Sequence, residues 1–304
     1  MLTEKQRLSM LETPRGMADV VIDTDAYNEI DDQFAIAYAL RRPDKLNVRA
    51  IYAAPFLNHR SASPADGMER SYQEIMKLLA LTGETRDVYR GSDCYLPDER
   101  TFVPSPAAED LSRRAMEYSP EKPLYVVALG AITNVASALL INPAIADHIV
   151  VVWLGGHALE WPDNREFNMQ QDVAAARVVY GSSVPLVMLP CCGVVSAFAT
   201  TGPELDHWLR GRNALCDYLV QNTVDEAETY AKGRVWSRVI WDVTAVAWLL
   251  NDGGRFMWDR LISTPVPEYD HRWRITADAP PCRYVCAIHR DALFDDLFRR
   301  LSGE

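Results

Sequence analysis

The sequence predicts an α/β fold in which an open, mostly parallel sheet is covered by helices on both of its faces. Two observations lead to this fold class. Short apolar runs alternate with longer amphipathic stretches up to about residue 200. The short runs are almost continuously apolar, as expected for strands that are buried on both faces. Such alternation is typical of parallel β-α-β units in a Rossmann-like sheet.

The predicted strands are short apolar runs, and the predicted helices carry apolar residues at helical spacing. The strands cover residues 19–22, 48–54, 88–89, 124–129, 149–154 and 185–189. The helices between them cover residues 32–41, 67–81, 105–116, 132–141 and 172–180. Ser105-Pro106 is a helix start signal, and Asn142-Pro143 is a stop signal.

From about residue 203 the pattern becomes mainly helical. A long helix is expected over residues 213–232 and a short one over 244–250, followed by a small tail of strands and loops over 254–288. There is no internal repeat, low-complexity tract or linker. We therefore expect a single domain, 1–304, with residues 1–18 as an N-terminal extension and 203–304 as its mainly helical part.

Composition and charge exclude several classes of protein. With 48% hydrophobic and 24% charged residues, the 304-residue chain has an ordinary globular composition. Its net charge of −11 argues against a nucleic-acid partner. No apolar run has the length of a membrane span or a signal peptide, so we expect no membrane association and a cytoplasmic location. Six cysteines are too few for a disulfide scaffold, and we expect free thiols.

An acidic cluster follows the first predicted strand. Asp23 and Asp25 are two residues apart, so a strand would place both on one face. Asp31 and Asp32 begin the next helix, and Glu29 makes five carboxylates within ten residues. The junction from strand to helix lines the ligand crevice of an open α/β sheet.

Carboxylates gathered at close range need positive charge among them. A helix N-terminus supplies about half a charge, whereas a divalent cation supplies two. Oxygen ligands without Cys or His suit Ca²⁺ or Mg²⁺ rather than zinc. The alternative is that Asp31 and Asp32 merely cap the helix, while Asp23 ends the strand.

Three further polar segments are weaker signals when each is taken alone. Glu166 and Asn168 lie in a loop after Gly155-Gly156. Asp242 stands at the head of an apolar helix, where it could be an N-cap. Asn58 follows a strand and Pro55, where it could be a turn residue.

Together these segments resemble the inosine–uridine-preferring nucleoside hydrolase family. The matching segments, in the family's order, are DTDAYNEIDD (23–32), AAPFLN (53–58), ALGAITNVA (128–136), WLGG…EFN (153–168) and WDVTAVA (241–247). The resemblance implies the nucleoside hydrolase fold, a bound Ca²⁺, and hydrolysis of the N-glycosidic bond of a ribonucleoside to ribose and free base. It also implies a homodimer or homotetramer.

The resemblance further implies roles for individual residues. Asp25 and Asp32 would hold the ion, together with the main-chain carbonyl of Leu129 and with Asp242 in the mainly helical part. Asp25 would be the general base that takes a proton from the ion-bound water, and Asp242 would also contact the ribose. Asp23 would support the metal site from behind. The ribose hydroxyls would be bound by Asp31, Asn58, Glu166 and Asn168. An oxocarbenium-like transition state suits such a site without a covalent nucleophile.

Two residues depart from the family pattern. Tyr27 stands in a longer metal motif where Gly is usual; because Tyr does not readily adopt positive φ, we expect a different turn, with Tyr27 projecting into or over the pocket. Trp241 stands where many members have a His that protonates the leaving base. One hypothesis is that Trp241 or Trp236 stacks on the base, worth about 1 kcal/mol, while solvent protonates it. His157, after Gly155-Gly156, is a further candidate for a ligand contact.

Three other functions stay open at this point. A phosphotransferase of the haloacid-dehalogenase type also begins with DxD at a strand end, but Tyr27 stands where that class has Thr or Val. A sugar- and metal-binding homologue without turnover would explain the departures at Tyr27 and Trp241. A hydrolase for a modified or 5′-substituted nucleoside would keep the chemistry and change the substrate.

Overall fold

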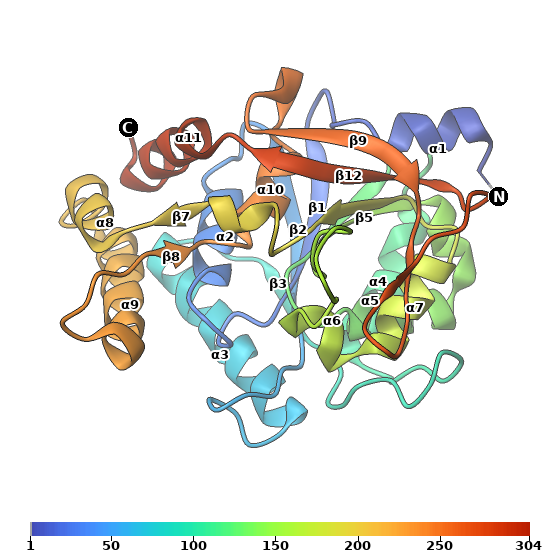
Figure 1. The fold of residues 1–304 in the computed structure, drawn as a ribbon, viewed down its shortest axis with the longest axis horizontal. Coiled ribbons are helices and arrows are strands. Elements are labelled where there is room, and N and C mark those ends of the chain that lie inside the picture. Colours follow the sequence, from blue (N-terminus) through green and yellow to red (C-terminus); the bar gives the residue numbers. More distant parts are fainter. Residues whose placement is uncertain (1) are drawn as a thin grey trace.

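The computed structural model describes residues 2–304 and confirms the α/β fold class (Figure 1). Its eight-stranded sheet has the strand order β3-β2-β1-β4-β5-β6-β12-β9. Neighbouring strands are parallel except for the last pair, β12 and β9. The strands are β1 (Ala18–Thr24), β2 (Leu46–Ala53), β3 (Asp87–Arg90), β4 (Leu124–Ala128), β5 (Ile149–Leu154), β6 (Leu186–Leu189), β9 (Met257–Ser263) and β12 (Pro281–Ile288).

Helices cover both faces, because alternate residues of the strands enter two separate apolar clusters. In β1, Val20 and Ile22 belong to one cluster and Val21 to the other. The first cluster includes residues of α2 (Asp32–Leu40), α3 (Pro64–Thr82), α9 (Ala214–Ala231), α10 (Val243–Trp248) and α11 (Arg290–Ser302). The second includes residues of α4 (Pro106–Arg114), α5 (Thr133–Ile141) and α7 (Val173–Gly181), which lie together beside the sheet in Figure 1.

Shorter elements connect these layers. The short helices are α1 (Glu4–Met10), α6 (Phe167–Gln171) and α8 (Gly202–Trp208), with 3₁₀ turns at Ala115–Glu117, Pro143–Asp147, Val195–Ala197 and Asp252–Gly254. Two small antiparallel pairs are β7 (Ala199–Thr200) with β8 (Arg238–Val239), and β10 (Val266–Pro267) with β11 (Trp273–Arg274). Within residues 2–304, no helix combines the length and the apolar character that a membrane crossing requires.

The C-terminal part differs from its prediction. Residues 254–288 are not a separate tail, because β12 pairs with β6 and β9 forms the edge of the same sheet. Helix α11 after them was not predicted. Its apolar residues, including Leu293 and Leu297, pack into the first cluster.

The order of the strands sets the place of a ligand crevice. After β1 the chain forms β2 and β3 on one side, and then returns to form β4 on the other side of β1. Ligands of open α/β sheets bind at the carboxyl ends of strands where the order reverses in this way. Here Leu129 N–H donates to the carbonyl of Asp23 (2.8 Å), so the ends of β1 and β4 meet. A Cβ on Gly130 would lie 2.8 Å from Cγ of Asp25, and this close approach requires glycine.

Candidate active site

A cavity opens at this reversal point. Its lining includes eight of the residues predicted from the sequence: Asp25, Asp31, Asp32, Leu129, Glu166, Asn168, Trp241 and Asp242. Asp23 and Asn58 are not in the lining. The other lining residues are Asn28, Glu29, Leu154, His157, Arg165, Phe167, Cys191 and Cys192.

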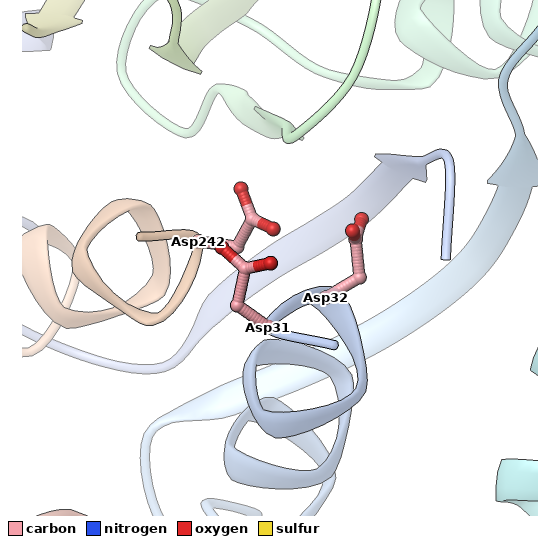
Figure 2. A group of neighbouring side chains, drawn as sticks. All are labelled: Asp31, Asp32 and Asp242. Atoms are coloured by element: carbon pink, nitrogen blue, oxygen red, sulfur yellow. The ribbon is translucent and has the colours of Figure 1, made fainter. Parts of the chain in front are cut away.

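Three carboxylates converge at the start of two helices. Asp31 and Asp32 begin α2, Asp242 begins α10, and their side chains point into a common space (Figure 2). One oxygen from each can be chosen so that all three lie within 4.8 Å of one another, and all three residues are buried. Asp31 and Asp242 hold the N-cap positions, yet neither side chain accepts a capping hydrogen bond. Helix capping therefore does not explain these two acids.

Several buried oxygens of the site have no hydrogen-bond partner among residues 2–304. They are both oxygens of Asp25, Oδ1 of Asp242 and Oδ2 of Asp23. Asp32, in contrast, accepts a hydrogen bond from the hydroxyl of Thr24. Leaving buried carboxylate oxygens without partners is costly, so such atoms mark a binding site. An oxygen-only donor set of this charge fits a hard divalent cation.

Burial dominates the ionisation of these acids. It raises the pKa of Asp25 and of Asp242 well above the usual range, and the neighbouring carboxylates raise both further. The same causes raise the pKa of Asp32 to about 8 and that of Asp31 to about 6. Arg238 opposes the shift at Asp31 and forms an ion pair with Glu29. The group can therefore be fully ionised near neutral pH only when more positive charge is bound.

Asp23 lies outside the cavity lining, beside the end of β1. Its Oδ1 accepts a hydrogen bond from Nδ2 of Asn134 (2.8 Å), and Asn134 in turn accepts one from the N–H of Ser92 (2.7 Å). Burial raises the pKa of Asp23 to about 7, although the bond from Asn134 lowers it. Asn134 was not predicted as a site residue, although it lies within the quoted segment 128–136.

The segment of Glu166 and Asn168 is not a loop as expected, because it begins helix α6. Glu166 is the N-cap, and its carboxylate accepts hydrogen bonds from the N–H groups of Gly156, Asn168 and Met169 (2.8–2.9 Å). Nδ2 of Asn168 donates to the carbonyls of Leu129 (2.7 Å) and Leu154 (3.1 Å). These bonds leave the side-chain oxygen of Asn168 for a ligand. The carbonyl of Leu129 keeps its second lone pair.

Asn58 reaches the cavity only through another residue. Its Nδ2 donates to Oδ1 of Asn28 (2.7 Å), which lines the cavity. Trp241 also lines the cavity, whereas Trp236 packs against Gly202.

The prediction for Tyr27 is half right. The turn at Tyr27 avoids positive φ, as expected for Tyr. The ring does not project into the pocket, however. It lies 5.9 Å from the guanidinium of Arg60 and 5.7 Å from that of Arg70, outside the cavity lining.

His157, named from the sequence as a candidate for a ligand contact, does line the cavity and comes after β5. Cys191 and Cys192, which were not predicted, come after the next strand, β6. The signal that could have found them is their place, since strand ends of a parallel sheet share one edge.

Comparison with known sequences places this cavity in a family context. The family model described as "Inosine-uridine preferring nucleoside hydrolase" matches residues 20–284. The pyrimidine-specific ribonucleoside hydrolase RihA of Escherichia coli O127:H6 is 26% identical over 261 residues, covering 76% of this chain and 79% of that protein. RihA of Citrobacter koseri is 27% identical over 249 residues, covering 72% and 76%.

Solved structures share the fold. A purine-preferring ribonucleoside hydrolase from Gardnerella vaginalis superimposes with a TM-score of 0.76 at 19% identity, covering 94% of this chain and 98% of that chain. The plant nucleoside hydrolase PpNRh1 gives a TM-score of 0.72 at 19% identity, covering 94% and 99%.

Proposed function

The chain belongs to the inosine-uridine preferring nucleoside hydrolase family and is a nucleoside hydrolase, and we propose that it cleaves a ribonucleoside through the acidic cavity described above. The products would be ribose and the free base. One observation carries the proposal: buried carboxylate oxygens without partners gather where the strand order reverses. Family membership removes the phosphotransferase alternative, and the relatives named as ribonucleoside hydrolases support turnover over a homologue that only binds sugar and metal.

We propose Ca²⁺ as the cofactor of this site. The side chains of Asp25, Asp32 and Asp242 and the carbonyl of Leu129 would hold it, with Asp31 beside them. Support comes from the oxygen-only donor set and from the unpartnered oxygens of Asp25 and Asp242. When bound, the ion would balance the buried negative charge and acidify water.

The residues of the chain then divide the remaining work. Asp25 would accept the proton of the water that attacks C1′ of the sugar. Asp31, Asp242 and the side-chain oxygen of Asn168 would accept hydrogen bonds from the ribose hydroxyls. Glu166 would fix the loop that carries Asn168, and Asn58 would act through Asn28. The surrounding carboxylates stabilise the positive charge that develops on the ring in an oxocarbenium-like transition state.

The base is held by the rest of the cavity, where Trp241 would contact its flat face. Names of relatives do not fix its identity, because one relative is called pyrimidine-specific and one structural neighbour purine-preferring. Tyr27 was the reason to consider a modified nucleoside, and its ring lies outside the cavity. We therefore propose an ordinary ribonucleoside as substrate.

A panel of common ribonucleosides tests the proposal, with release of free ribose as the readout. The enzyme is assayed as prepared, after exhaustive chelation, and after addition of Ca²⁺. We expect ribose from at least one nucleoside, loss of activity on chelation, and recovery with Ca²⁺. Activity that survives chelation would contradict the metal assignment, and the absence of ribose from every nucleoside would contradict the substrate class.

Domain organisation, assembly and location complete the proposal. A single domain over residues 1–304 is supported by one sheet that takes strands from both ends of the chain. A cytoplasmic location is supported by six cysteines that are all free thiols. The family resemblance suggests a homodimer or homotetramer, which light scattering coupled to size exclusion would test.

A further inference from the structure

One wall of the cavity comes from the loops that follow β5 and β6. His157, in the loop after β5, contributes its imidazole ring to this wall. The ring of His157 is half-buried and packs against Trp161 at 5.9 Å between ring centroids. Trp161 is 46% exposed, whereas Asp25 and Asp242 are only 1% and 3% exposed. His157 therefore lines the same cavity as the buried acids and contacts an aromatic ring that is open to solvent.

Hydrogen bonds fix the position of His157 on three sides. Its N–H donates to Oδ1 of Asn164 (2.7 Å), and its carbonyl accepts from Nε1 of Trp273 (3.3 Å). Ring Nδ1 accepts from the N–H of Cys192 (3.3 Å). Within residues 2–304, Nε2 is the one polar atom of His157 that these bonds leave for a ligand.

The bond to Nδ1 also decides the tautomer. A main-chain N–H can only donate, so Nδ1 carries no proton and the neutral ring holds its proton on Nε2. Burial lowers the pKa of His157, and nearby Asp163 opposes that shift only in part. The ring is thus a neutral donor with a fixed direction.

Two other donors of the lining, Asn168 and Arg165, are poorly suited to a heterocycle. Both protons of the Asn168 amide can be used by the carbonyls of Leu129 and Leu154. Arg165 is exposed, and the acids offer only acceptors when ionised. Every common nucleobase, in contrast, carries ring-nitrogen or carbonyl acceptors, and negative charge grows on them as the bond to C1′ breaks.

We propose that His157 is a catalytic residue whose Nε2–H donates a hydrogen bond to an acceptor atom of the departing base. This inference rests on the proposed function and deepens it. The acids and the ion would act on the sugar, while His157 would stabilise the leaving group without giving up its proton. A donor aimed at developing charge contributes to the rate rather than only to binding.

Two substrates with the same sugar separate these roles. One is the best ribonucleoside of the panel, and the other is 4-nitrophenyl β-D-ribofuranoside, whose leaving group departs without help. We expect His157→Ala to lower kcat/KM for the nucleoside by about 30-fold or more, mainly through kcat, and for the nitrophenyl riboside by less than about threefold. His157→Gln can place an amide N–H near the same point and should restore part of the loss. The matched control is His59→Ala, since His59 is exposed and outside the cavity lining.

Five outcomes would overturn the inference. Equal losses on both substrates would assign His157 to the sugar or to the structure of the loop, and no loss on the nucleoside would remove its role. Loss of an alkaline limb from the pH profile of His157→Ala would indicate a proton donor instead of a neutral hydrogen-bond donor. Cleavage of the nitrophenyl riboside alone by the wild type would remove base activation and leave the proposed sugar chemistry intact. If the wild type cleaves neither substrate, the proposed function fails, and this inference fails with it.

Discussion

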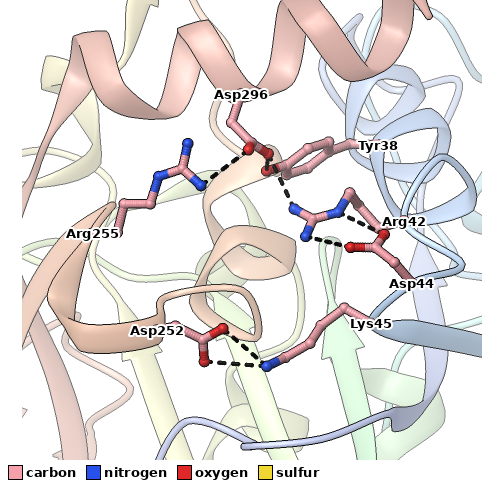
Figure 3. Close-up of polar contacts among 7 residues, drawn as sticks. All are labelled: Tyr38, Arg42, Asp44, Lys45, Asp252, Arg255 and Asp296. Carbon is pink, nitrogen blue, oxygen red and sulfur yellow. Dashed lines mark hydrogen bonds and ion pairs between the residues drawn. The ribbon is translucent and has the colours of Figure 1, made fainter. Parts of the chain in front are cut away.

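Buried carboxylates lie at both ends of helix α2, but only the one at the C-terminal end has cationic partners on both oxygens. At the C-terminal end, Asp296 of α11 accepts hydrogen bonds from Tyr38 (2.5 Å) and Arg42 (3.1 Å), as Figure 3 shows. Arg255 adds an ion pair to the other oxygen at 3.3 Å. At the N-terminal end, Asp31 and Asp32 share their space with Asp25 and Asp242, and the nearby Arg238 is paired with Glu29.

The comparison separates a structural acid from a functional one. Asp296 and Asp242 are nearly equally buried, with 6% and 3% exposure. Asp296 has cations on both oxygens, whereas Asp242 has an oxygen with no partner. Burial alone therefore does not identify the site. The missing internal partner does, because the unfavourable charge there is left for a ligand to balance.

The largest expected effect is a loss of activity when the acids at the N-terminal end of α2 are replaced. Asp25→Ala or Asp242→Ala should lower kcat by about 10³-fold or more, since each substitution removes a proposed ligand of the ion. Asp25→Ala also removes the proposed general base. Thermal unfolding of the metal-free variants should show an unchanged or raised Tm, because a buried unpaired charge is lost. A variant that keeps a tenth of the activity, or that is strongly destabilised, would contradict a functional rather than structural role for these acids.

At the C-terminal end of α2, replacing the acid should lower stability instead of activity. Asp296→Ala leaves Arg42 and the hydroxyl of Tyr38 without their partner, which should cost about 3 kcal/mol in the free energy of unfolding. Denaturant unfolding measures this cost, while kcat at a temperature where the variant stays folded should be unchanged. A large loss of kcat in the folded variant would mean that the two ends are coupled.

The free energy of unfolding should depend on pH through Asp31 and Asp32 at the N-terminal end of α2. The pKa values of Asp31 and Asp32 are raised to about 6 and about 8 in the folded protein, above their values in the unfolded chain. Their contribution is therefore fully present below about pH 4 and is lost as pH rises through 6 and 8. In chelator, Tm should fall by roughly 5 °C between pH 5 and pH 8.

Added Ca²⁺ should oppose this fall, and should raise Tm more at pH 8 than at pH 5. The double variant Asp31→Asn, Asp32→Asn serves as the control and should show a flatter dependence. An equal effect of Ca²⁺ at both values of pH would argue against these acids as the titrating groups.

The smallest effect is expected for an ion pair near the C-terminal end of α2 in which the acid is exposed. Lys45 Nζ lies 3.0 Å from Oδ2 of Asp252, whose side chain is 66% exposed (Figure 3). Because water screens such a pair, Lys45→Ala should change the free energy of unfolding by less than about 1 kcal/mol. A loss as large as that of Asp296→Ala would show that exposure is not what separates the two ion pairs.

The parts of the fold that could be predicted are those that depend on short-range sequence patterns. The first units, from β1 to β6, follow from apolar runs and turn residues that lie close together in sequence. The pairing of β12 with β6 joins Arg283 to Val187, and no local pattern indicates a partner so distant. Helix α11 does carry a local signal, since Leu293, Leu297 and Leu301 are at helical spacing before Gly303.

In the candidate site, too, local sequence identifies some residues, while other contacts are revealed only by the fold. Its acids stand in one short segment plus Asp242, so the motif could be read directly from residue types. The bond between Cys192 and His157 links loops from two strands, and only the folded chain reveals it. Tyr27 shows the limit of spacing: the sequence restricts its φ, but Arg60 and Arg70 decide where the ring points.

Asp242 stands about 210 residues after Asp32, and helix α10 must pack before the two acids can meet. A nascent chain that has emerged only as far as β6 has a nearly complete parallel sheet but lacks this acid. Cation binding would therefore be a late event in biosynthesis and would report that the C-terminal third has docked. Fragments ending before α10 should fail to retain the ion, however native their first strands look.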